Sequence, residues 1–146
     1  MPRLQASLLV SLVVAAVSLA GCGAGGAASG ATVSVYAAAP LCKEARRGSG
    51  AAGDLQLRVV CLPSSGSREA DLAAVGAAAR RATEDSTSVA VLEAPGPAAE
   101  FSRPIVEAAD IAWIETSSGS TAMRRIRTAL EGDASSPRKA VLDEVG

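Results

Sequence analysis

Histidine is absent from the 146 residues. Without an imidazole, the chain has no Ser–His or Cys–His pair and no histidine to act as a general base. The neighbouring carboxylates Glu84 and Asp85 are more typical of a solvated helix end than of an acid–base pair. The sequence therefore predicts a protein that is not an enzyme.

Aromatic residues are also scarce, being limited to Tyr36, Phe101 and Trp113. A core built without them must consist of Ala, Val, Leu and Ile, which favours helices packed closely on a sheet. The three cysteines and the missing histidines give no metal-ligand set, because two cysteines alone are half a zinc site. We therefore expect neither a metal nor a cofactor.

The first residues have the pattern of a secretory signal. Arg3 precedes an apolar run over residues 8–17, which is shorter than the roughly 20 residues of a membrane-spanning helix. The run ends in Leu19-Ala20-Gly21-Cys22, a lipobox in which the cysteine thiol receives lipid. The alternative is an ordinary cleaved signal with an incidental cysteine. The lipobox interpretation predicts a signal peptide over residues 1–21 and lipidation of Cys22.

Residues 23–30 are Gly, Ala and Ser only, so residues 22–31 are interpreted as the lipidated cysteine and a flexible tether. Acyl chains such as palmitate would hold the protein on the extracytoplasmic face of the cell membrane. Residues 32–146 are enough for a single domain. Loss of Arg3 changes the net charge from −1 to about −2, which gives no electrostatic case for nucleic acid or anionic lipid.

Cys42 and Cys61 remain in the domain, outside the cytoplasm if the signal is real. An even pair of cysteines in an oxidising compartment is more often a disulfide than two thiols. A Cys42–Cys61 disulfide is therefore predicted.

Strand and helix patterns alternate along the domain. In helix 98–109 we expect Phe101 to face inward and Pro104 to mark a late start or a kink. This order predicts an α/β fold of three layers, Rossmann-like, with a four-stranded parallel sheet and helices on both faces. The expected strands are 32–36, 55–62, 88–92 and 111–114, and the expected helices are 43–47, 69–83, 98–109, one after residue 121 and one from Pro137.

Ligands of parallel sheets bind at the carboxyl ends of the strands. The segment after the first strand, residues 37–40, lacks the glycines of a phosphate-binding loop. Residues 116–121, in contrast, are rich in hydroxyl groups and open a helix, which makes them suited to a carboxylate. The alternative is a simple helix cap, and the pattern alone favours that alternative.

Three segments resemble the first lobe of the type I periplasmic solute-binding proteins, the branched-chain amino-acid binding family of ABC importers. They are Val35-Tyr36 followed by Pro40-Leu41, the stretch ADLAAV at 70–75, and SRPIVEAADIAWI at 102–114 leading into TSSG at 116–119. The resemblance implies that Ser117, Ser118 and Gly119 contact the α-carboxylate and α-amino groups of an amino acid. It also implies a contact from Gly96, in the loop after the third strand.

The chain departs from that family in two ways. It has room for one lobe where the family has two, and its loop 93–97 carries two prolines and Glu93, whose charge would repel a carboxylate. We therefore expect a lipid-anchored, solute-binding-like protein associated with ABC-type amino-acid uptake, with weak or degenerate binding of a small solute such as an amino acid. An ABC permease or a protein supplying a second lobe would be its partner. The alternative is a non-transport lipoprotein that serves as an interaction or structural module.

Overall fold

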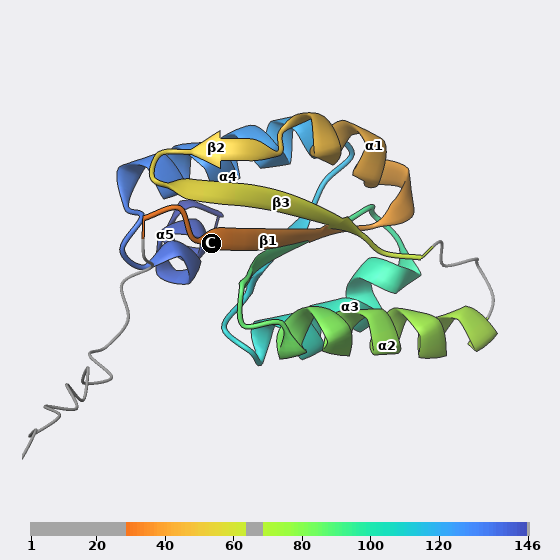
Figure 1. Ribbon diagram of the computed structural model, residues 1–146. Helices are drawn as coiled ribbons and strands as arrows, with labels where there is room; N and C mark the ends of the chain where they lie inside the picture. The colour runs from red at the N-terminus through yellow and green to blue at the C-terminus, as the bar shows by residue number, and fades with distance from the viewer. Residues whose placement is uncertain (1–28, 64–68, 146) are drawn as a thin grey trace, which may run out of the picture.

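The computed structural model describes residues 29–63 and 69–145 (Figure 1). The predicted signal peptide, Cys22 and residues 23–28 lie outside this part of the chain. The strands are β1 (Thr32–Ala37), β2 (Gly50–Ala52), β3 (Leu55–Cys61), β4 (Ser88–Glu93) and β5 (Ala112–Glu115). The helices are α1 (Ala39–Arg47), α2 (Glu69–Glu84), α3 (Pro97–Glu107), α4 (Gly119–Gly132) and α5 (Pro137–Val145).

The α/β prediction is confirmed, but the sheet is mixed and has five strands in the order β2-β3-β1-β4-β5. The four predicted strands are parallel, with β1 between β3 and β4. The fifth, β2, pairs antiparallel to β3, with Ala52 opposite Leu55. The pattern missed β2 because its three residues, Gly-Ala-Ala, have no β-branched side chain and too little length for alternation. Gly53, at φ +58°, makes the tight turn between the two strands.

Helices cover both faces of the sheet (Figure 1). One core lies between the sheet and α1, α4 and α5, and the other lies between the sheet and α2 and α3. Every residue of β4 is buried, as expected for a central strand covered on both faces. The three-layer arrangement brings the carboxyl ends of β1, β3, β4 and β5 to one edge of the sheet.

Small residues let α1 and α4 approach closely. A Cβ atom built on Gly119 would lie 2.6 Å from the backbone oxygen of Leu41. One built on Gly48 would lie 2.7 Å from Cβ of Met123. Real Cβ atoms are not found this close to another heavy atom, so both positions require glycine at the observed helix separation. The scarcity of large side chains is thus matched by tight backbone packing.

One core prediction is wrong. Phe101, expected to face inward from α3, is 42% exposed. Its ring lies against α2 at Gly76, at the outer rim of the contact between the two helices, whereas Val106 fills the core. Helix α3 begins at Pro97 and contains Pro104 in its interior, so the late start is excluded.

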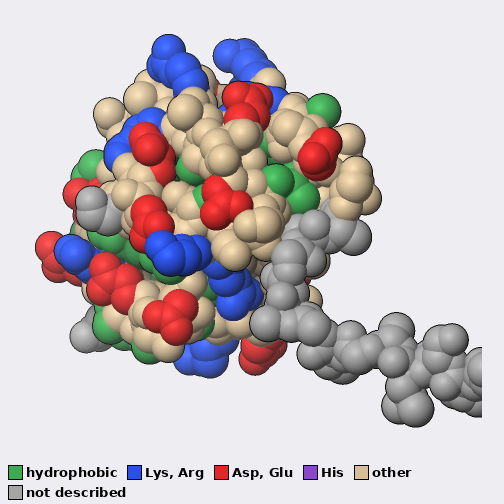
Figure 2. All heavy atoms as spheres, turned by 90° about the vertical axis from the view of Figure 1, so that its left-hand side faces the viewer, with side chains coloured by type: hydrophobic (Ala, Val, Ile, Leu, Met, Phe, Trp, Pro, Cys, Tyr) green, Lys and Arg blue, Asp and Glu red, His purple; other side chains and the backbone are tan. Residues whose placement is uncertain are grey.

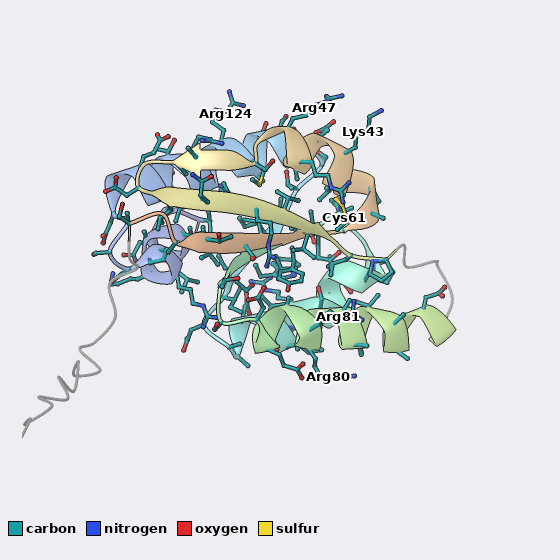
Figure 3. The ribbon with its side chains drawn as sticks, viewed as in Figure 1. Lys43, Arg47, Cys61, Arg80, Arg81 and Arg124 are labelled. Atoms are coloured by element: carbon teal, nitrogen blue, oxygen red, sulfur yellow. A yellow bond between two sulfur atoms is a disulfide. The ribbon has the colours of Figure 1, made fainter. Side chains whose placement is uncertain are left out.

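The two cysteines of the domain lie at disulfide distance, as predicted. Cys42, in α1, is bonded to Cys61 at the end of β3, and their Cα atoms are 5.5 Å apart. The bond joins the first turns of α1 to the carboxyl edge of the sheet (Figure 3). Among the described residues, no helix has the length and apolar character needed to cross a membrane.

Candidate functional site

The chain leaves β1 toward β3 on one side and later returns to β4 on the other side. Open α/β sheets bind ligands at such a switch point, outside the carboxyl ends of the strands. A narrow crevice lies there, lined mainly by apolar side chains, among them Leu62 and Val75, and by Glu93. It holds about 20 Å³, which is the space of a single water molecule. The crevice as it stands is therefore too small for an amino acid.

Glu93 is a buried acid in the wall of this crevice. It is the last residue of β4 and is 6% exposed. Burial raises the pKa of its carboxyl above the ordinary value of 4.5, and a hydrogen bond from Ser102 opposes this only in part. Ser102 Oγ also accepts a hydrogen bond from the indole Nε1 of Trp113 at 3.2 Å. Glu93 is thus a buried acid in the wall of the crevice, and only its ionised form would repel a bound carboxylate.

The stability of the protein should depend on pH through Glu93. Because its pKa is higher in the folded state, the unfolded state releases this proton first as the pH rises. Stability therefore falls between the unfolded and folded pKa values, and the penalty is complete above the folded pKa. We expect Glu93→Gln to raise the melting temperature at pH 7 and to lose that advantage at acid pH. Thermal denaturation measures this, with Glu115→Gln, an exposed acid, as the control. An equal effect of both variants would contradict the burial argument.

The predicted carboxylate site at the start of α4 is in contact with an acid of the protein itself. Ser118 is the N-cap, and its hydroxyl accepts a hydrogen bond from the backbone N–H of Thr121 at 3.3 Å. Glu44, on α1, places its Oε2 atom 3.4 Å from Ser118 Oγ and 3.5 Å from the backbone nitrogen of Ser120. Free N–H groups and the helix dipole favour an anion at this position. The Glu44 carboxylate is that anion here.

The other predicted contacts have different surroundings. Gly119 is buried against the backbone of α1, while Ser117 is exposed. Gly96 is the N-cap of α3 at φ +147°, and its carbonyl accepts the first backbone hydrogen bonds of that helix. Ser117 and Ser118 lead into α4 on one face of the sheet, whereas Gly96 leads into α3 on the other. The four residues therefore share one edge of the sheet and are divided between its two faces.

A polar network that the pattern did not reveal lies at the opposite end of the sheet. Asp85 accepts hydrogen bonds from the hydroxyl of Tyr36 at 2.8 Å and from both the N–H and the hydroxyl of Thr87. Arg58 lies 3.6 Å from it and also donates to Ser34. Burial alone would raise the pKa of Asp85, but these hydrogen bonds and Arg58 together hold it below the usual aspartate value. Asp85 is thus a structural acceptor and not simply a solvated helix end.

No family model matches this chain, and neither the curated proteins nor the solved structures compared with it give a match. In residues 29–63 and 69–145, no three Asp, Glu or Cys side chains are grouped in a way that could hold a metal ion.

Proposed function

We propose that this chain is a lipid-anchored, extracytoplasmic and non-enzymatic protein that uses a solute-binding-like α/β scaffold as an interaction module. Its affinity for free amino acids is very weak. The observation that carries this proposal is the position of Glu44, whose carboxylate lies where the resemblance places the carboxylate of a ligand.

Three physical effects act against tight binding of an amino acid. A ligand carboxylate at the start of α4 must displace Glu44, and the crevice, which lies on the α2 side of the sheet, holds only one water molecule. A single lobe also offers about half of the contacts of a two-lobed cleft. Halving the roughly −8 kcal/mol of a micromolar site leaves about −4 kcal/mol, which is a millimolar dissociation constant.

The role of Glu44 can be tested by stability. We expect Glu44→Gln to lower the free energy of unfolding by about 0.5–1 kcal/mol, because α4 loses an anion at its N-terminus. Millimolar acetate or an amino acid should then restore part of the loss in this variant and leave the wild-type melting temperature unchanged. Glu131→Gln is the matched control, since Glu131 lies at the other end of α4 and is exposed. Equal stabilisation of wild type and Glu44→Gln by the ligand would contradict the proposal.

A second candidate function is one half of a composite binding site, completed by a partner that supplies the other wall. It is favoured by the long contacts of Glu44, 3.4 and 3.5 Å, which a ligand could displace, and by the exposed hydroxyl of Ser117. An ABC permease or a second-lobe protein is the partner class. Such a site would bind amino acids only when the partner is present, and Ser117→Ala and Ser118→Ala would weaken that binding.

The anchor has its own test. We expect Cys22→Ser to block processing, so that the protein keeps the mass of the precursor and no longer fractionates as the mature lipoprotein does. Mass spectrometry of the membrane fraction measures both properties. A variant of mature mass that remains with the membrane as the wild type does would exclude lipidation at Cys22.

A further inference from the structure

The charges of this protein are unevenly distributed. Helices α1 and α4 contain six Lys or Arg residues against two acids, a net of +4, while the whole chain has a net charge of −1. The two helices pack side by side through Gly119 and Gly48, so their outer sides form one surface. A nearly neutral sequence therefore folds into a domain with a strongly basic face.

Lys43, Arg47 and Arg124 form the exposed part of this surface, which we name the basic face. Figure 3 shows all three side chains extending outward on the same side of the molecule, and in Figure 2 basic side chains protrude at that upper end. Lys43 and Arg47 are spaced i,i+4 on α1, where like charges repel and destabilise the helix. None of the three ion pairs found among the described residues involves α1 or α4. Among the described residues, therefore, no ion pair offsets this repulsion.

A shallow groove runs between the two helices below these side chains. It has a volume of about 440 Å³, and its walls include Arg47, Arg124, Arg127 and Glu44. Arg127 is held in place, since it donates to the backbone oxygens of Gly48, at 2.6 Å, and of Ala51. Among the described residues, Arg47 has no such partner, and Arg124 has only a long contact of 3.4 Å to Thr121. The outer cations are therefore available to anions beyond the protein.

We propose that the basic face docks on the anionic headgroups of the membrane to which the protein is tethered. This inference rests on the proposed lipid anchor. Ten peptide steps separate Cys22 from β1, which limits the reach of the domain to roughly 35 Å. Because the tether keeps the domain close to the membrane, the membrane is the anionic surface that the domain encounters most often. Charges spread along two helices suit a plane of headgroups better than a single small ligand.

Docking of the basic face orients the domain on the membrane. With α1 and α4 toward the bilayer, α2 and α3 on the other side of the sheet point away from it, where a partner protein can reach them. Lys and Arg residues gain binding energy near an anionic surface, and the gain decays over a Debye length of about 8 Å at physiological salt. Docking is thus salt-sensitive and reversible, in contrast to the anchor.

The test uses the mature chain, beginning at position 22 and carrying Cys22→Ser, so that binding does not depend on lipidation. Co-sedimentation is measured with vesicles of phosphatidylglycerol and phosphatidylcholine and with vesicles of phosphatidylcholine alone. We expect binding only to the anionic vesicles, and its loss at high salt. At about fivefold per charge, Arg47→Gln with Arg124→Gln should weaken it about 25-fold.

Arg80→Gln with Arg81→Gln is the matched control. It removes the same charge from α2, on the other side of the sheet (Figure 3), and should change binding less than twofold. Equal losses in the two double variants, or equal binding to both kinds of vesicle, would overturn the basic face as a membrane-docking surface. Because this variant carries no lipid, neither result bears on whether Cys22 is lipidated. The mass and fractionation of Cys22→Ser test the lipidation separately.

Discussion

Replacing Gly119 with alanine should destabilise the protein by about 2–3 kcal/mol, with a fall in melting temperature of about 10 °C. The added methyl group would lie 2.6 Å from the backbone oxygen of Leu41 and 3.0 Å from the backbone nitrogen of Ala45. Neither atom can rotate away as a flexible side chain can. Helices α1 and α4 must therefore separate, which also disturbs the contact between Glu44 and Ser120.

Gly132→Ala is the control for Gly119→Ala, because Gly132 lies in the same helix and, apart from its chain neighbours and the nearby backbone of α4 itself, no heavy atom lies within 4 Å of the added methyl group. It should leave stability unchanged or raise it slightly, since alanine favours helix more than glycine does. Urea denaturation of both variants measures the difference. Equal stability of the two variants would mean that the close approach of α1 and α4 is not a structural requirement.

Removing the Cys42–Cys61 disulfide should cost about 3 kcal/mol in the chain-entropy model, because the bond closes a loop of 19 residues in the unfolded chain. The double variant Cys42→Ala with Cys61→Ala removes it without burying a hydroxyl group. Denaturation of this variant should match that of the wild type treated with a reducing agent. The bond also holds α1 to the end of β3, so its loss should loosen the carboxyl edge of the sheet.

A thiol titration of the purified, oxidised domain is the direct check of this bond. It should detect no free thiol at Cys42 or Cys61. Two free thiols there, or an unchanged stability on reduction, would show that the pairing does not contribute as proposed.

The sequence pattern predicts β1, β3, β4 and β5 to within a residue at each end, because they are apolar or alternating runs bounded by turn residues. It fails at β2, whose three small residues have no pattern. It also places the start of α1 late, because residues 39–42 resemble a loop, although Pro40 is well suited to the first turn of a helix. The prediction that Phe101 faces inward is wrong because helical spacing indicates only on which face of α3 a residue lies. The packing of α2 then decides how much of that face is buried.

The features that decide the site are long-range and have no local signature. Glu44 and Ser118 are 74 residues apart, and only the packing of α1 on α4 brings them together. The basic face arises in the same way, from the packing of two helices. Their positive net charge is not visible in the net charge of the whole chain, because acids elsewhere offset it. Glu93 is different, because the sequence already showed an acid directly after the third predicted strand, although it was expected in the loop and is in fact the last, buried residue of β4.

Calorimetric titration of the purified monomer with free amino acids is the measurement that tests the central claim most directly. The occupied N-terminus of α4 and the single-water crevice together predict a dissociation constant near millimolar or weaker. A micromolar constant for any amino acid, lost in Ser118→Ala, would contradict this account and would make the protein a solute-binding protein in its own right.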